Sequence, residues 1–320
     1  MNYKIKKISG DASFREFYRI KKNYKTSIIV FAKKEKFKNL IVYCLVNNIL
    51  NKNKILAPKL IKNYYQDNMI EITDVGRKSF YEFIKRKKNK FSDYKNLVEI
   101  ILKLQKIKLK KIYFFGKNKI TFTKHSISHL HKESDLFFDW YLKSIIKNKN
   151  FSKIKKDIRQ ELNNIYKKIY FKNSYFTHKD FHASNIMIFN KKLAVIDSQD
   201  AIIGNPLYDV VSLIDDVRIK LPKDLQDNLL KYYILKSKFK NKDEHNLKND
   251  FDILSIQRNL KILGIFVRLY QRDQKPNYLK YLPYTWSLIE RRMKNPIFDR
   301  LNKLFEKYLP LEKLKRLQKI

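Results

Sequence analysis

The sequence has few of the residues that stabilise small secreted folds or build metal sites. Its 320 residues include one cysteine, Cys44, and five glycines. A single cysteine cannot form an internal disulfide or a cysteine-based metal site, so a reducing, cytoplasmic setting is expected. No apolar run approaches about 18 residues, and no signal-peptide core follows Met1. We therefore predict no membrane span.

Acidic residues are scarce relative to basic ones. The chain has 31 Asp and Glu against 71 Lys and Arg, which gives a formal net charge of +40. Clustered cations bind nucleic acid by releasing counterions from phosphates. Here, however, lysine is spread along the whole chain together with Asn, Ile, Tyr and Phe, the residues of A- and T-rich codons. The charge favours anionic ligands such as nucleotides, and no specific nucleic-acid partner is predicted.

The first part of the chain is predicted to be rich in strands. Two β-prone runs, 17–20 and 27–31, flank a polar stretch and predict a hairpin. A helix is expected over 37–51, and two more strands over 59–65 and 67–73. Asp74-Val75-Gly76 then predicts a break in regular structure.

From Ser79 onward amphipathic helical patterns dominate, for example over 94–107 and 151–170. One island of strands interrupts them, with a short strand at 175–178 and a hairpin made of 186–189 and 193–196. A small β-rich lobe before a larger, mainly helical lobe predicts the α+β class and a bilobal, protein-kinase-like fold. We expect a nucleotide-binding lobe over residues 1–73 and a catalytic and substrate-binding lobe over 74–320.

The island also carries the residues that phosphoryl transfer needs. Asp180 and Asn185 stand five residues apart on one loop, and the hairpin returns the chain so that Asp197 enters the same cleft. Phosphoryl transfer requires metal ions that bridge the phosphates, an oriented hydroxyl and a proton acceptor. Asp and Asn oxygens are the hard ligands that Mg²⁺ prefers. The alternative is that these side chains merely cap turns, and the spacing to Asp197 argues against it.

The segment His178 to Asn185 has the pattern H-x-D-x-x-x-x-N, which resembles the catalytic loop of kinases. Together with Ile196 to Asp200 and Gly204 to Asp209, it resembles the aminoglycoside phosphotransferase and choline kinase superfamily. Ser198-Gln199 stand where protein kinases have Phe-Gly. The resemblance implies a two-lobed kinase fold and a small-molecule acceptor.

Three further segments resemble one branch of that superfamily, the anomeric kinases of N-acetylmuramate and N-acetylglucosamine. They are Gly10 to Arg15, Glu133 to Tyr141, and Gln257 to Phe266 with Tyr281-Leu282-Pro283 after it. This resemblance implies an ATP- and Mg²⁺-dependent sugar 1-kinase of cell-wall recycling. A kinase of the same fold with another acceptor, such as an aminoglycoside, choline or a different sugar, remains an alternative. A non-catalytic protein that binds nucleic acid through its charge is the alternative from another class.

The resemblance also implies roles for individual residues. Asp180 is expected to be the catalytic base, Asn185 and Asp197 the metal ligands, and Asp209 a structural brace. The nucleotide is expected to contact the phosphate loop, the inter-lobe hinge and one strand lysine: Gly10, Asp11, Ala12, Ser13; Thr73, Asp74, Val75; and Lys33. A solvated strand end is the other interpretation of Lys33.

Three other groups of residues have both a functional and a structural interpretation. Trp140 and Tyr141 either line a sugar pocket or pack in the core. Arg258 and Asn259 either touch substrate or brace the catalytic loop. The three histidines at positions 125, 129 and 131 either bind a metal or pack against helices, and the sequence supplies no cysteine or carboxylate pattern that would complete a metal site.

Overall fold

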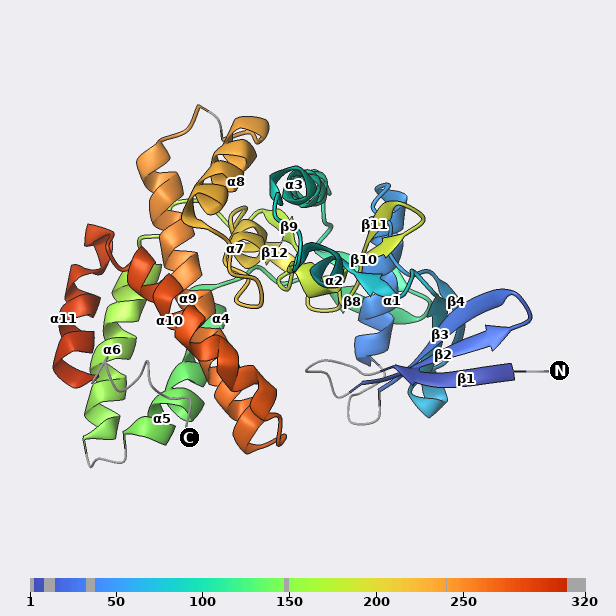
Figure 1. Ribbon diagram of the computed structural model, residues 1–320, viewed down its shortest axis with the longest axis horizontal. Helices are drawn as coiled ribbons and strands as arrows, with labels where there is room; N and C mark the ends of the chain where they lie inside the picture. Colours follow the sequence, from blue (N-terminus) through green and yellow to red (C-terminus); the bar gives the residue numbers. More distant parts are fainter. Residues whose placement is uncertain (1–2, 9–14, 33–37, 147–149, 240, 310–320) are drawn as a thin grey trace. The chain divides into compact units, whose positions relative to one another are not determined.

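The computed structural model describes residues 3–8, 15–32, 38–146, 150–239 and 241–309. The chain forms two compact units (Figure 1). The first comprises Met1–Thr123 and Tyr175–Ile203, and the second comprises Lys124–Ser174 and Gly204–Ile320. The predicted division into a nucleotide-binding lobe over residues 1–73 and a catalytic lobe over 74–320 does not coincide with these units, and it stays a prediction.

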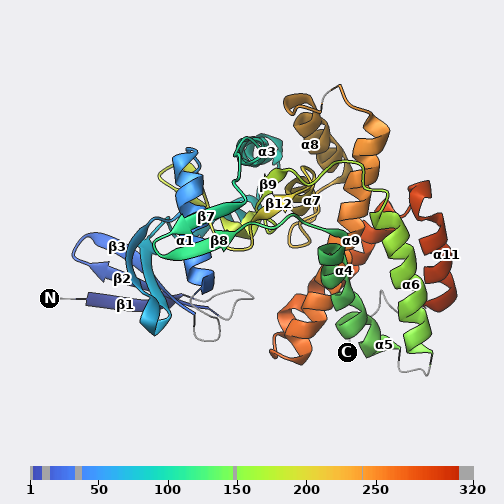
Figure 2. The ribbon, with the colours of Figure 1, turned by 180° about the vertical axis from the view of Figure 1, so that it is seen from behind.

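The first unit contains a five-stranded antiparallel sheet in the order β1-β2-β3-β5-β4. Figure 2 shows β1, β2 and β3 of this sheet. Its strands are β1 (Tyr3–Ile8), β2 (Glu16–Lys22), β3 (Lys25–Phe31), β4 (Leu60–Tyr64) and β5 (Met69–Thr73). The predicted first hairpin is confirmed as β2 and β3, which pair with Phe17 opposite Val30. Asn23 turns the chain with a φ of 54°, a left-handed conformation that asparagine tolerates better than most residues.

One helix, α1 (Lys38–Lys52), packs against this sheet. Val30 and Ala32 on the sheet side form a buried cluster with Leu40, Tyr43 and Cys44 of α1. Removal of this apolar surface from water contributes about 25 cal/mol per Å² to folding. The predicted helix over 37–51 is therefore confirmed from residue 38 onward and ends one residue later than predicted, at Lys52, whereas residue 37 lies outside the described residues.

Five further strands lie near the predicted catalytic loop. They are β6 (Lys78–Ser79), β9 (Tyr175–Thr177), β10 (Ile186–Phe189), β11 (Lys192–Val195) and β12 (Ile202–Gly204). The second predicted hairpin is confirmed as β10 and β11, and β6 extends it to a three-stranded sheet. Asn190 and Lys191 at its tip have φ values of 48° and 62°, as a two-residue type I′ turn requires.

One hairpin lies where only helices were expected. The helices α2 (Phe80–Ile84) and α3 (Phe91–Gln105) are followed by β7 (Ile112–Phe115) and β8 (Asn118–Thr121), which pair antiparallel. Gly116 in the connecting turn has a φ of 57°, which costs glycine little because it has no Cβ.

The second unit is helical. Its helices are α4 (Ile127–Leu136), a π-helix (Phe137–Leu142), α5 (Lys143–Ile145), α6 (Phe151–Tyr166), α7 (Tyr208–Ile214), α8 (Lys223–Lys236), α9 (Glu244–Gln271), α10 (Leu282–Arg292) and α11 (Asp299–Tyr308). The 28-residue helix α9 is central and contacts α4, the π-helix, α7 and α10. Residues on all sides of its middle turns are buried, as expected for a helix surrounded by others.

A close helix contact joins α9 to the start of the π-helix. Gly264 lies so near the Leu136 carbonyl that a Cβ at this position would overlap it. Only glycine therefore fits here. This contact brings together the two predicted motifs, Glu133 to Tyr141 and Gln257 to Phe266.

These observations confirm the α+β class, with a β-rich N-terminal part and a larger helical C-terminal part. Among the helices that the structure describes, none has both the length and the apolar character needed to cross a bilayer.

Candidate active site

The predicted catalytic loop connects β9 to β10 within the first unit. His178 is fully buried, and its Nε2 lies 3.0 Å from the backbone oxygen of Ile196. Phe181 is also fully buried and packs edge-on against the His178 ring. These two side chains anchor the loop, so Asp180 between them is held as a half-buried residue.

The amide of Asn185 is oriented by the loop itself. Its Nδ2 donates a 3.0 Å hydrogen bond to the backbone oxygen of Asp180. Because the nitrogen is committed to this bond, the side-chain oxygen is the atom that can face a cation. The backbone oxygen of Asn185 accepts a 3.0 Å bond from the amide of Ile196, which ties the loop to the residue before Asp197.

Asp197 lies two residues after the end of β11 and has a left-handed backbone, with a φ of 62°. Aspartate adopts this conformation more readily than most residues. Its Oδ1 accepts a 3.0 Å hydrogen bond from Gln199 Nε2. The hairpin thus returns Asp197 to the loop that carries Asp180 and Asn185, as the spacing predicted.

The surroundings of Asp197 disfavour the ionised form of its carboxylate. Burial raises the pKa of Asp197 to about 6, and the nearby Asp180 carboxylate adds to the increase. Neighbouring negative charges disfavour the ionised form of a carboxylate, and a cation bound beside them favours it. A cation bound beside Asp197 would therefore offset both causes of its raised pKa.

The donor set fits Mg²⁺ bound together with phosphates. Within the described residues, no group of three or more His, Cys, Asp or Glu side chains forms a metal site by itself. A cation here would be held by oxygens of Asn185 and Asp197 together with the phosphates of the nucleotide and water, as Mg²⁺ in nucleotide sites is. The roles of both residues as metal ligands stay predictions.

Arg15 is a buried cation near Asp197 that we did not single out from the sequence. Arg15 is 6% exposed, and its Nη1 donates a 2.9 Å bond to Gln199, the same residue that contacts Asp197. The guanidinium also lies 6.0 Å from the ring centroid of Tyr43. Its charge favours the ionised form of Asp197. Arg15 is the only cation of the predicted Gly10 to Arg15 motif, which was the signal that could have found it.

A second contact that the sequence did not predict joins Ser198, the residue after Asp197, to helix α1. Ser198 is fully buried, and its hydroxyl donates a 2.7 Å hydrogen bond to Oδ1 of Asn47, which is 2% exposed. The residue next to Asp197 is thereby held by the helix that packs on the sheet. A buried bond of this kind constrains both partners, because breaking it leaves a polar atom unpaired.

The predicted hinge follows β5. Asp74 accepts two hydrogen bonds from Arg19, at 2.6 and 3.1 Å, and one from the Gly76 amide at 3.0 Å. Burial alone would raise the pKa of Asp74, but these bonds hold it below its ordinary value. Gly76 has a φ of 107°, and a Cβ there would lie 2.7 Å from the Ile188 oxygen. The break predicted at this point is confirmed, whereas nucleotide contacts of Thr73, Asp74 and Val75 stay predictions.

Five predicted nucleotide-binding residues lie outside the described part of the chain. They are the phosphate-loop residues and the candidate strand lysine: Gly10, Asp11, Ala12, Ser13 and Lys33.

In the second unit, the branch motifs meet at Glu133, which is 8% exposed. Its Oε2 accepts hydrogen bonds from Tyr208 Oη at 2.9 Å and Gln257 Nε2 at 3.0 Å. Lys261 Nζ lies 3.5 Å from Oε1. Glu133 therefore links three of the motifs that we recognised separately in the sequence.

Two open questions from the sequence concern core packing in this unit. Tyr141 is fully buried, stacks on Phe137 and accepts a 2.6 Å hydrogen bond from Trp286, so it belongs to the core. His129 caps α4 through Ser126, and His131 Nε2 lies 3.1 Å from Asn163 Oδ1.

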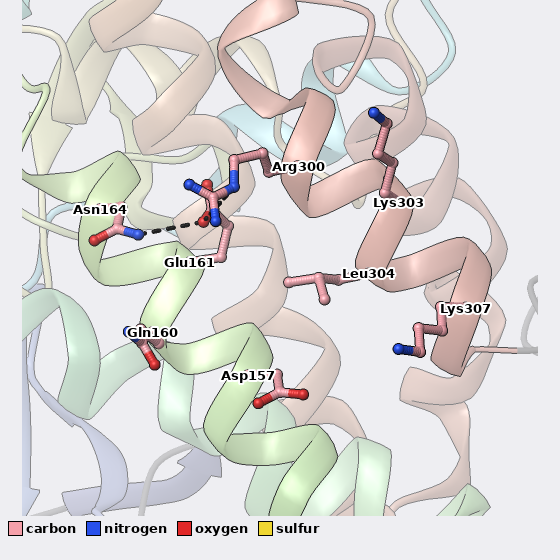
Figure 3. A pocket seen from close by; sticks show the side chains of 8 residues that line it. All are labelled: Asp157, Gln160, Glu161, Asn164, Arg300, Lys303, Leu304 and Lys307. Atoms are coloured by element: carbon pink, nitrogen blue, oxygen red, sulfur yellow. Dashed lines mark hydrogen bonds and ion pairs between the residues drawn. The ribbon is translucent and has the colours of Figure 1, made fainter.

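A polar hollow of about 390 Å³ lies between α6 and α11 (Figure 3). Its walls include Glu161, which contacts Asn164 at 3.3 Å and Arg300 at 3.6 Å. None of the predicted site residues lines it.

The fold and the loop geometry are those of a phosphotransferase with the architecture of the kinases. A model of the phosphotransferase enzyme family matches residues 89–245, which include Asp180, Asn185 and Asp197. Over these residues the chain is similar to that family.

Several proteins of known name or structure are similar to the chain. N-acetylmuramate/N-acetylglucosamine kinase of Pseudomonas aeruginosa is 22% identical over 286 residues, which are 88% of this chain and 81% of the relative. The enzyme of the same name from Neisseria meningitidis is 22% identical over 287 residues, 88% of this chain and 84% of the relative.

Among solved structures, a choline/ethanolamine kinase family protein from Mesorhizobium loti superposes with a TM-score of 0.62 at 12% identity, covering 95% of this chain and 92% of its own. ADP-bound aminoglycoside phosphotransferase APH(2'')-Ib gives a TM-score of 0.60 at 15% identity, covering 90% of this chain and 92% of its own. These structures confirm the predicted bilobal kinase fold.

Proposed function

We propose that the chain transfers the terminal phosphoryl group of ATP to the anomeric hydroxyl of N-acetylmuramate or N-acetylglucosamine, in the recycling of cell-wall sugars. The arrangement of Asp180, Asn185 and Asp197 on one loop and hairpin is the observation that supports phosphoryl transfer. The names of the relatives, which cover most of the chain, support the acceptor.

In this mechanism Asp180 accepts a hydrogen bond from the anomeric hydroxyl and takes its proton as the new oxygen–phosphorus bond forms. The bond between the terminal phosphorus and the bridging oxygen breaks, and ADP leaves with the electron pair. The anomeric hydroxyl is more acidic than an ordinary alcohol, so a carboxylate of ordinary basicity suffices. Mg²⁺ held by Asn185 and Asp197 would neutralise charge on the phosphates.

The test is a screen for ADP release by the purified protein with Mg-ATP. The acceptors are N-acetylmuramate, N-acetylglucosamine, other free sugars, choline and an aminoglycoside, and Asp180→Ala is the control. We expect turnover on the two amino sugars, reduced about 10²- to 10⁴-fold in the variant, with Mg-ATP binding retained. Turnover only on choline or an aminoglycoside would reject the acceptor, and full activity of Asp180→Ala would reject the base.

A further inference from the structure

The β7–β8 hairpin of the first unit packs through one face only. The Tyr113 ring packs edge-on against Phe122, with 5.5 Å between ring centroids, and Phe115 packs against the core cluster of the sheet and α1. Side chains alternate along a strand, so the other two residues of β7 point the opposite way. Ile112 is 39% exposed and Phe114 is 73% exposed. The hairpin is thus held through one face and presents apolar side chains on the other.

The second strand of the hairpin adds a lysine to this outward face. Phe114 lies opposite Lys119 in the antiparallel pairing, and Ile112 lies opposite Thr121. Both residues of β8 are exposed. Residues directly opposite one another on paired strands stand side by side on the same face. The outward face therefore combines two apolar side chains with one ammonium and one hydroxyl group.

Every charged side chain of this segment is a lysine. Residues 106–122 contain no Asp, Glu or Arg and six exposed lysines, which are Lys106, Lys108, Lys110, Lys111, Lys117 and Lys119. None of the six forms an ion pair with a residue that the structure describes. The whole chain has 31 acidic residues to 71 Lys and Arg, so this segment is more strongly cationic than the chain as a whole.

A hollow of about 400 Å³ beside the hairpin shows that these cations gather in space as well as in sequence. Lys52, the last residue of α1, lines it together with Lys106 and Lys108. Tyr113 of the hairpin forms part of its wall, and none of the described residues that line it is acidic. The base of the hairpin therefore presents a positive field to any anionic surface that approaches it.

We propose that the outward face of the β7–β8 hairpin docks on a membrane surface that contains anionic lipids. Phe114 and Ile112 enter the boundary between headgroups and acyl chains, where apolar side chains leave water. The lysines around them attract the negative headgroups.

The same face fits two other partners less well. A single-stranded nucleic acid would use the charge and could stack a base on Phe114, but Ile112 has no ring for stacking. A second copy of this chain would bring the same lysines against these, and like charges repel one another. The lipid surface is the partner that uses both the apolar side chains and the lysines.

The test is co-sedimentation of the full chain with vesicles of mixed phosphatidylglycerol and phosphatidylcholine, and with vesicles of phosphatidylcholine alone. We expect binding to the mixed vesicles only, and weaker binding as salt rises, because salt screens exposed charges. Phe114→Ser is expected to weaken binding about 5- to 10-fold. The triple variant Lys111→Gln, Lys117→Gln and Lys119→Gln is expected to weaken it about 100-fold.

Two matched controls remove the same chemistry from the second unit. Leu235→Ser replaces an apolar residue of α8 that is 63% exposed. A second triple variant, Lys153→Gln, Lys156→Gln and Lys167→Gln, removes three exposed lysines in and directly after α6. Both should bind the mixed vesicles within about 2-fold of the wild type. The hairpin variants should keep the wild-type melting temperature, because the replaced side chains are exposed.

Four results would overturn the inference. They are no binding to the mixed vesicles, equal losses in the hairpin and control variants, which would leave net charge as the cause, a marked fall in the melting temperature of Phe114→Ser, which would show that Phe114 packs within the protein, and binding of poly(U) but not of vesicles, lost in Phe114→Ser, which would assign the face to nucleic acid. The assay contains no sugar or nucleotide, so its result is independent of the proposed function.

Discussion

Replacing Asp197 by asparagine is expected to have opposite effects on the metal-free protein and on the protein that holds a magnesium nucleotide. The pKa of Asp197 rises from 3.8 to about 6 through burial and the Asp180 carboxylate. For a fully buried group a shift of two units corresponds to about 3 kcal/mol. Asp197 is half-buried, so screening reduces the relief in Asp197→Asn to about 1–2 kcal/mol. The melting temperature of the metal-free variant should rise by about 2–6 °C.

With Mg-ATP bound, the wild type should be more stable than Asp197→Asn. A ligand at 100 times its Kd stabilises the folded wild type by about 2.7 kcal/mol. Asp197→Asn loses the ionised ligand and should gain little of this. Differential scanning fluorimetry with and without magnesium and nucleotide measures both effects. Asp200→Asn is the control, since Asp200 is exposed, accepts a 3.2 Å hydrogen bond from the Gln199 amide, and its charge is the smallest of the causes that shift the pKa of Asp197.

The pH dependence of the stability of the metal-free protein gives the sign of the Asp197→Asn effect. The folded pKa lies above the ordinary value, so the folded protein holds this proton more tightly than the unfolded chain. The stabilisation from protonating Asp197 is present at low pH and is lost as pH rises through about 6. The metal-free wild type and Asp197→Asn should therefore converge in stability only as pH falls towards the ordinary pKa of 3.8. A metal-free variant less stable than the wild type at pH 7 would refute the reasoning, because the carboxylate would then make structural bonds.

Two other substitutions test the structure around the site and the helical unit. Ser198→Ala removes the hydroxyl that donates to the buried Oδ1 of Asn47, and it should lower the free energy of unfolding by about 1–3 kcal/mol. The variant should also bind Mg-ATP more weakly. Unchanged binding would show that this hydrogen bond does not position Asp197. Gly264→Ala places a methyl group against the Leu136 carbonyl and should cost at least about 1–3 kcal/mol in chemical denaturation, and an unaffected variant would contradict the close contact.

The elements predicted best from the sequence are those whose signal is local. The β10–β11 hairpin has two short apolar runs joined by a turn of Asn190 and Lys191, so short-range chemistry determines it. The β7–β8 hairpin was missed because β8 (Asn118–Thr121) contains a single apolar residue, Ile120, and so has no apolar pattern of its own.

The end of α6 was predicted too late, at Tyr170 in place of Tyr166. The amides of Tyr170 and Phe171 donate to the carboxylate of Asp250, at 2.7 and 2.9 Å. Asp250 is 80 positions away from Tyr170 in the sequence, so no local pattern shows this competition for the backbone.

The site residues show the same difference between local signals, which the sequence reveals, and long-range contacts, which it does not. Asp180, Asn185 and Asp197 form a motif of fixed spacing, and the structure places them on one loop and hairpin of the first unit. The contacts around them were not predictable, because Arg15 meets Gln199 across 184 positions and Asn47 meets Ser198 across 151. Such pairs become visible only when the sheet, α1 and the hairpin have packed together.

The position of the phosphate on the product tests the central proposal most directly. The purified chain is incubated with Mg-ATP and N-acetylglucosamine, and the product is examined by proton-coupled phosphorus NMR. A phosphate on the anomeric oxygen couples to the single proton of C1, and the proposal predicts this doublet. A triplet from coupling to the two protons of C6 would contradict it and make the chain a 6-kinase of the same fold.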